Sequence, residues 1–240
     1  MCIRDRYLAH ETLPKSGTDD VLGVQLAQIL SEASLSLFVR QAAAIALKKY
    51  VRKRWSIFFD TFTQDMVVNG IVQTVDATPV DAKEHIRTSL LACLCDAEPK
   101  VRSQASDILS LISSCDFPDH FPQLLPTLQA YLHSYTEQDA HAAYKVHGAM
   151  KFLLDLVHVE LDENQLLMVA QQLVPLLQGI VSSSSDWITP HTRARCINVF
   201  HQCLISLYMA KDTYVDTVHM VTTHYLPPWL QGMQAVSYTH

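Results

Sequence analysis

The chain has 240 residues, of which 49% are hydrophobic and only 6 are glycine. So few glycines exclude a turn-rich β architecture, and the length suits either one large domain or a helical array, so we predict a mostly helical protein. The net charge of −6 excludes the basic balance of a nucleic-acid-binding protein, so we expect no direct nucleic-acid binding and a preference for basic partners.

Two terminal segments are set apart from the predicted fold. Residues 1–13 show no helical period and, like residues 236–240, are interpreted as non-native or disordered. Residues 14–235 are expected to form one array of about four to five helix pairs that is truncated at both ends. No charged-then-apolar leader precedes the array, which argues against secretion. Glutamines and Pro175 interrupt the longest apolar run, 166–181, so we expect no membrane insertion.

The first helix pair is predicted over 19–31 and 35–53. The second helix ends in a basic cluster without an acid, which we interpret as a solvated face rather than as an exposed localisation signal. After it, the sequence predicts a looser connection over 55–79. The residues of the second helix that we expect to be buried are Val39, Ala42, Ala43, Ala46, Leu47 and Tyr50.

The clearest pattern lies between Cys93 and Ile112. A turn that contains Asp96, Pro99 and Arg102 follows a predicted helix over 80–95 and leads into a helix with one apolar stripe. The apolar stripe consists of Val101, Ala105, Ile108, Leu109 and Ile112, and the opposite, polar side carries Ser103, Ser106, Asp107 and Ser110.

Later segments repeat this pattern. A helix over about 117–132 contains Pro126, and the next, after Ala140, has Val146, Met150, Leu153 and Val157 on its apolar side. A further pair is predicted over 162–181, with Pro175 inside, and 190–210, and a last helix over 213–227. The residues expected to be buried on the helix 190–210 are Cys196, Val199, Phe200, Cys203, Leu204 and Leu207. The recurrence predicts an all-α fold, a right-handed α-α superhelix without any sheet.

Asp96, Pro99 and Arg102 resemble the second half of a HEAT repeat. Arg40, His147 and Arg193 or Arg195 occupy the place of Arg102 in the other copies, at intervals of 45 residues from Arg102 to His147 and 46 from His147 to Arg193. In HEAT proteins the acid and the arginine bond from one repeat to the next. The resemblance therefore implies a structural ladder of Arg40, Asp96, Arg102 and Arg193.

Several segments resemble the N-terminal region of importin-β-type nuclear transport receptors. They are 38–41, 48–50 with Trp55, 98–109, 117–122, 145–151 and 192–195. The resemblance implies that the second helices line a concave surface for the GTPase Ran in its GTP form. It also implies basic cargo such as core histones, contacts with nuclear pore proteins, and shuttling between cytoplasm and nucleus. The acidic balance of the chain agrees with a basic cargo.

Two polar stripes are the candidate contacts for Ran. Gln41, Lys48 and Arg52 fall at i, i+7 and i+11 of one helix. His147, Lys151 and Asp155 fall at i, i+4 and i+8 of another. An ordinary solvated face has the same pattern, so that interpretation stays open. A second function also stays open, a cytoplasmic HEAT-repeat scaffold of a phosphatase or ligase complex that does not bind Ran.

No catalytic motif accompanies these helices. The sequence has no glycine-rich phosphate loop, no GxSxG elbow and no HExxH pair, so we expect no enzymatic activity and no cofactor. Six cysteines form no CxxC pair and lack histidines at metal spacing, so we expect no metal site. We interpret the cysteines as small apolar side chains in a protein of a reducing compartment.

Overall fold

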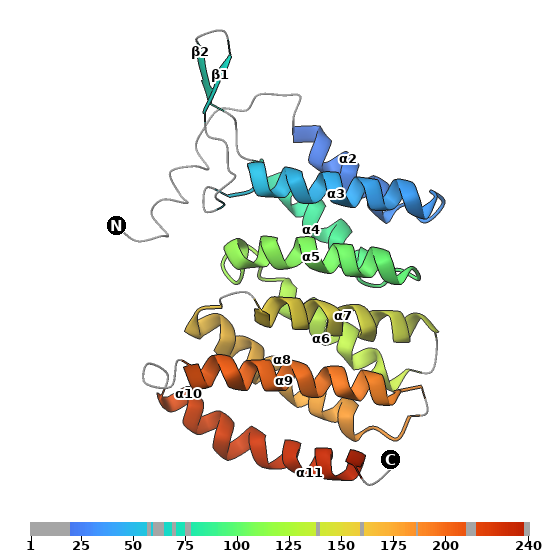
Figure 1. Ribbon diagram of the computed structural model, residues 1–240, viewed down its shortest axis with the longest axis vertical. Coiled ribbons are helices and arrows are strands. Elements are labelled where there is room, and N and C mark those ends of the chain that lie inside the picture. The colour runs from blue at the N-terminus through green and yellow to red at the C-terminus, as the bar shows by residue number, and fades with distance from the viewer. Residues whose placement is uncertain are drawn as a thin grey trace. The chain divides into compact units, whose positions relative to one another are not determined.

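The computed structural model describes residues 20–56, 59, 65–68, 71–74, 78–137, 140–158, 161–185, 187–209 and 215–237. The chain divides into two units, Met1–Cys115 and Asp116–His240, and helix pairs build each of them (Figure 1). Residues 1–13 and 238–240 lie outside the described residues, so the expectation for them stays a prediction, whereas residues 236 and 237, also expected to be non-native or disordered, form the end of the last helix, Leu226–Ser237.

Four helices form the first unit: α2 (Asp20–Ser31), α3 (Leu37–Arg54), α4 (Val80–Cys93) and α5 (Pro99–Asp116). The first helix of the unit, α2, packs against both α3 and α4. In Figure 1, α3 and α5 lie in front and α2 and α4 lie behind them. The predicted boundaries of α2, α3 and α4 agree with the observed ones to within about two residues.

The apolar stripe of α5 is confirmed. All five predicted residues are at most 1% exposed. The predicted polar side is partly wrong, because Ser106 and Ser110 are also buried. The hydroxyl of Ser110 donates to the carbonyl of Asp107 at 3.1 Å, so this small polar side chain enters the core with its donor satisfied.

The buried stripe of α3 differs from the prediction. Val39 is 43% exposed and Ala42 is exposed, whereas Arg40, Ala44 and Val51 are buried. The buried face of α3 is rotated relative to the prediction because Arg40 forms an ion pair in the interior. A prediction from the spacing of apolar residues does not place an arginine there. Ala43, Leu47 and Tyr50 are buried as predicted, and Ala46 is half-buried.

A β-hairpin interrupts the connection between α3 and α4. Strands β1 (Asp65–Val68) and β2 (Ile71–Thr74) pair antiparallel, with Val68 opposite Ile71. The prediction of a fold without any sheet is therefore wrong. The sequence Asn69-Gly70 between the strands is the preferred dipeptide of a two-residue hairpin turn, and β-branched residues flank it. Asn69 and Gly70 themselves lie outside the described residues.

Trp55 closes the C-terminal end of α3. Its ring is 1% exposed, and Lys83 Nζ and the guanidinium carbon of Arg87 lie 5.3 Å and 5.6 Å from the ring centroid. The amide of Thr78 donates to the carbonyl of Arg54 at 2.8 Å. These contacts bring the start of α4 back to the end of α3 after the hairpin.

The second unit consists of α6 (Leu124–His133), the 3-10 turn η1 (Ser134–Thr136), α7 (Ala140–His158), α8 (Glu163–Ser182), α9 (Pro190–Met209) and a last helical run. That run contains α10 (Val215–Met220), the π-helical turn η2 (Val221–Tyr225) and α11 (Leu226–Ser237). α6 packs against α7 and α8, and α9 packs against the same two helices. In Figure 1, α7 and α9 lie in front of α6 and α8.

Two proline predictions for this unit are wrong. Turns occupy residues 117–120, and α6 begins only at Leu124, so Pro126 lies in its first turn, where no intrahelical hydrogen bond is lost. The last helix does not end at Pro227, because the helical run passes through the π-helical turn and continues to Ser237. Pro175 does lie inside α8 as predicted.

The core of the second unit largely follows the sequence pattern. Val146, Met150, Leu153 and Val157 of α7 are at most 5% exposed. On α9 the predicted residues are buried except Leu204, which is half-buried. Phe200 of α9 stacks on Trp229 of α11, with ring centroids 4.3 Å apart.

The segment Asn164–Ser182 of α8 has the length and hydropathy of a membrane span, and half of it is buried inside the protein. Its buried side chains pack in the core of the second unit, between α6 and α9. Gln165 begins the helix with a capping box to Asp162. These features are those of a core helix.

Gly23 is a position where the packing between helices can be tested. A Cβ atom there would meet a ring carbon of Tyr50 at 2.5 Å and Cδ1 of Ile86 at 3.0 Å. The Tyr50 ring is buried and its hydroxyl accepts a bond from Thr78, so it cannot turn away. We expect Gly23→Ala to lower the stability of the first unit by about 1 kcal/mol, because overpacking exceeds the gain in helix propensity.

Gly179→Ala is the matched control. A Cβ atom at Gly179 would meet only the end of the Tyr135 side chain, with its hydroxyl at 3.0 Å. We expect an unchanged or raised melting temperature for this variant. Thermal unfolding of both variants, followed by circular dichroism, distinguishes them. A Gly23→Ala protein that melts above the parent contradicts the close packing of α2 on α3.

Candidate functional site

The outward stripe of α3 is the candidate site on the first unit. Five exposed residues fall at i, i+4, i+7, i+11 and i+14 of the helix. The stripe is apolar in its first half, where Phe38 is 81% and Ile45 is 55% exposed, and basic in its second half. Exposed apolar side chains that lie together on one helix face mark a candidate interaction surface. The outward stripe consists of Phe38, Ala42, Ile45, Lys49 and Arg52.

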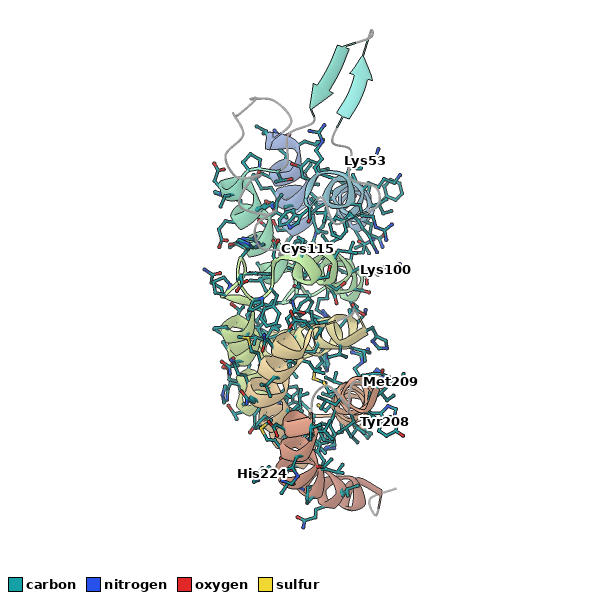
Figure 2. All side chains as sticks on the ribbon, turned by 90° about the vertical axis from the view of Figure 1, so that its left-hand side faces the viewer. Lys53, Lys100, Cys115, Tyr208, Met209 and His224 are labelled. Carbon is teal, nitrogen blue, oxygen red and sulfur yellow. The ribbon has the colours of Figure 1, made fainter. Side chains whose placement is uncertain are left out.

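The basic half of the outward stripe continues into the last turn of α3. Arg52, Lys53 and Arg54 lie in that turn, and α3 contains no acidic residue. Figure 2 shows the Lys53 side chain projecting from the helix into solvent. Cations at a helix C-terminus are favoured by the helix dipole, and together these residues give this end of α3 a positive potential that suits an acidic surface on a partner.

Only one of the three residues predicted on α3 lies on the outward stripe. Arg52 lies on the outward stripe, whereas Gln41 is half-buried. Lys48 turns toward α5, where its Nζ lies 3.5 Å from a carboxylate oxygen of Asp107. Phe38, Ile45 and Lys49 were not predicted, because the candidate contacts were chosen among polar residues at the spacing of Gln41, Lys48 and Arg52.

The stripe predicted on α7 belongs to the second unit. Lys151 Nζ contacts both carboxylate oxygens of Asp155, at 2.6 Å and 2.5 Å, so the two charges neutralise each other. His147 Nε2 lies 3.1 Å from the hydroxyl of Thr192, which places it in a contact between α7 and α9. All three residues are half-buried. The stripe offers a partner less charge than the pattern suggested.

The arginines of the predicted ladder form two kinds of contact, an ion pair with a carboxylate and hydrogen bonds to backbone carbonyls. Arg40 Nε donates to the carbonyl of Leu30 at 2.8 Å, and its Nη1 lies 3.3 Å from Oδ1 of Asp96, across to the next helix pair. Its Nη2 also pairs with Oδ2 of Asp96. Arg102 instead donates to the backbone carbonyls of Asp96 and Ala97, at 2.5 Å and 2.9 Å, within its own turn. Arg193 Nη2 donates to the carbonyl of Ser183 at 2.7 Å.

The bonds that Arg40 and Arg193 donate to backbone carbonyls lie at the C-terminal ends of helices. Leu30 lies in the last turn of α2, and Ser183 is the C-cap of α8, so Arg40 and Arg193 each satisfy a carbonyl that the preceding helix leaves open. A cation at this end also interacts favourably with the helix dipole. These arginines therefore fix the second helices α3 and α9 to their first helices.

The described residues offer no site for metal chemistry, since they contain no group of three histidine, cysteine or acidic side chains that could hold an ion. Among the thiols, burial raises the pKa of Cys93, Cys196 and Cys203 to about 12, with the Asp96 carboxylate adding to the effect at Cys93. Thiols with such pKa values are poor nucleophiles.

We expect alkylation to separate the cysteines into two groups. A pKa raised from 9.0 to about 12 lowers the thiolate fraction at pH 8 about a thousandfold, and burial hinders the reagent as well. In the native protein, iodoacetamide should therefore label the half-buried Cys95 and Cys115 and leave Cys93, Cys196 and Cys203 unmodified until the chain unfolds. Peptide mass spectrometry measures this, and equal labelling of the two groups at early times contradicts the buried positions.

The outward stripe of α3 lies in a segment that matches a known protein family. Residues 9–96, which include α2, α3 and α4, match the importin-beta N-terminal domain. The matched range begins within the segment 1–13 that the sequence analysis set aside. The outward stripe of α3 lies inside the matched domain.

Two relatives extend the similarity to most of the chain. Importin subunit beta-5 of Schizosaccharomyces pombe is 28% identical over 203 residues, which is 84% of this chain and 19% of that protein. Importin-9 of Drosophila melanogaster is 25% identical over 185 residues, or 77% of this chain and 16% of that protein. The chain therefore spans less than a fifth of the length of these curated relatives.

A solved structure shares the fold. The nuclear transport receptor Lph2 of S. cerevisiae, described as bidirectional, superposes with a TM-score of 0.61 at 14% identity, and the match covers 91% of this chain and 23% of that one. This similarity confirms the predicted all-α helical-repeat class.

Proposed function

We propose, because this chain belongs to the importin-β family of nuclear transport receptors, that it contributes the N-terminal, Ran-binding part of a nuclear import receptor. The observation that carries the proposal is the family match over 9–96, which contains the outward stripe of α3. The names of two relatives, an importin subunit beta-5 and an importin-9, support import as the direction of transport.

Ran in its GTP form is the proposed partner of the outward stripe. Phe38 and Ile45 supply apolar area, and Lys49 and Arg52 supply positive charge next to it. A buried apolar anchor with a charged rim is the usual composition of a protein–protein interface. On the second unit, His147, Lys151 and Asp155 remain candidates for a weaker, polar contribution.

Basic proteins, with core histones as the example, are the proposed cargo. The net charge of −6 supports this, because an acidic receptor attracts basic partners at long range. Contacts with nuclear pore proteins and shuttling between cytoplasm and nucleus belong to the same proposal.

A pull-down separates this function from the scaffold alternative. The immobilised chain is incubated with Ran locked in its GTP form, with Ran in its GDP form, and with core histones. Retention of only the GTP form supports the proposed function as a nuclear transport receptor. Retention of both nucleotide forms in equal amounts, or of neither, favours a HEAT-repeat scaffold that does not respond to Ran.

A further inference from the structure

Arg193 differs from Arg40 in one respect. Each arginine donates to the backbone carbonyl ten residues before it, at the C-terminal end of the preceding helix. Arg40 also pairs with the carboxylate of Asp96. Arg193 is half-buried, and no carboxylate of the described residues lies within ion-pair distance of it. The guanidinium of Arg193 therefore has an open place for an anion.

A serine loop lies directly at this guanidinium. The carbonyl of Ser183 accepts the bond from Arg193, and the hydroxyl of Ser183 donates to Ser185 Oγ at 3.1 Å and accepts from the Ser185 amide at 3.2 Å. Ser184, the next residue, is exposed, and its hydroxyl makes no hydrogen bond with any described residue. Because the peptide unit joining Ser183 and Ser184 contacts the guanidinium, a group on Ser184 Oγ is within a side chain's length of Arg193.

The described residues around the loop carry charges that suit an anion, and the one acid in the loop's sequence, Asp186, lies outside the described residues. The first turn of α9 contains His191 and Arg193 and no acid. The N-terminal end of α9 attracts negative charge, whereas the C-terminal end of α8 opposes it. The effects of these two helix ends on a negative charge oppose each other. The ion pair with Arg193 therefore determines whether a phosphate is favoured in the loop.

We propose that Ser184 is a phosphorylation site and that its phosphate pairs with Arg193. The phosphate then supplies, between α8 and α9, the anionic group that Asp96 supplies to Arg40 in the first unit. A protein kinase forms a bond from Ser184 Oγ to the γ-phosphorus of ATP and breaks the bond to the β,γ-bridging oxygen. ADP leaves, and the hydroxyl proton passes to the base of the kinase.

The modification should tighten the corner between α8 and α9. A phosphoserine presents three acceptor oxygens, and the planar fork of an arginine binds them with two parallel hydrogen bonds. Ile188, 1% exposed, already fixes the far end of the loop, so little further ordering is required. This inference is independent of the transport function.

Two measurements test the proposal on the whole chain. The first is phosphopeptide mapping of the protein expressed in eukaryotic cells with phosphatase inhibitors, compared with a Ser184→Ala variant. Phosphate at Ser184 that disappears in Ser184→Ala is the expected result. No phosphate at Ser184, or phosphate only on a neighbouring serine, overturns the assignment of the site.

The second measurement tests the pairing with Arg193. Phosphoserine is incorporated genetically at position 184 in the parent and in Arg193→Gln, with Arg195→Gln as the matched control. In the parent and the control we expect a rise in melting temperature of about 2 °C and slower amide exchange over 183–193. In Arg193→Gln we expect neither change. An equal rise in Arg193→Gln overturns the pairing.

Discussion

Arg40→Ala should destabilise the first unit by about 3–5 kcal/mol, the largest effect that we expect of any single substitution in the chain. Arg40 is 3% exposed and Asp96 12%, so the substitution leaves a carboxylate without its cation in a largely dry environment. It also removes the donor that satisfies the carbonyl of Leu30. The first loss acts on the contact between the first two helix pairs, and the second acts within the first pair, between α3 and α2.

Lys48→Ala is the matched control for this prediction. Lys48 also pairs with an acid of the next helix pair, Asp107, but the two side chains are 36% and 42% exposed. Water screens such a pair, so we expect a loss of less than about 1 kcal/mol. Amide hydrogen exchange over α2, α3 and α4, together with thermal unfolding, measures both variants. Equal effects of Arg40→Ala and Lys48→Ala contradict the structural role of the Arg40–Asp96 pair.

A double-mutant cycle separates the pair from its surroundings. Arg40→Met combined with Asp96→Leu removes both charges, so no charge is left buried alone. We expect the double variant to be more stable than the sum of the two single losses predicts. An additive result would show that the two side chains do not interact.

Reversing three charges on α3 should weaken Ran binding by more than about tenfold, or roughly 1.4 kcal/mol. The variant is Lys49→Glu, Arg52→Glu and Lys53→Glu, three exposed residues at the basic end of the helix. Lys48 and Lys151, which the sequence pattern favours, are unsuitable because Asp107 and Asp155 already bind their ammonium groups. Rim charges act mainly on the association rate, so the effect should shrink as salt is raised.

Two controls accompany the charge reversal. Lys100→Glu reverses an exposed charge in the first turn of α5, outside the outward stripe, and should leave Ran binding unchanged. Phe38→Ser removes the apolar anchor without altering charge and should weaken binding independently of salt. Helix content should stay the same in all three proteins. If the triple variant binds Ran like the parent, the interface lies elsewhere.

Regular packing could be predicted from the periodicity of the sequence, whereas the polar contacts could not, and the ladder residues were implied only by the resemblance to HEAT repeats. The α5 stripe was correct because its helix buries aliphatic side chains at the helical period. The α3 stripe was misplaced because Arg40 is buried through a partner 56 residues away, which no local pattern contains. The same reason applies to Lys48, because the position of α5 brings the carboxylate of Asp107 next to it.

The elements between helices were predicted least well. Asn69-Gly70 with flanking β-branched residues is a hairpin signal, but the strands are only four residues long, and they stand within a connection that otherwise has no period. Pro126 and Pro175 look alike in sequence. They differ because α6 begins two residues before Pro126, whereas α8 begins twelve residues before Pro175.

Titration of this chain with Ran in its two nucleotide states tests the proposed function most directly. Isothermal calorimetry with Ran-GTP and with Ran-GDP, at one fixed salt concentration, measures both affinities. We expect Ran-GTP to bind at least about tenfold more tightly than Ran-GDP, a difference of 1.4 kcal/mol. Equal affinities for the two forms, or no binding of either, would contradict the assignment of this surface to Ran.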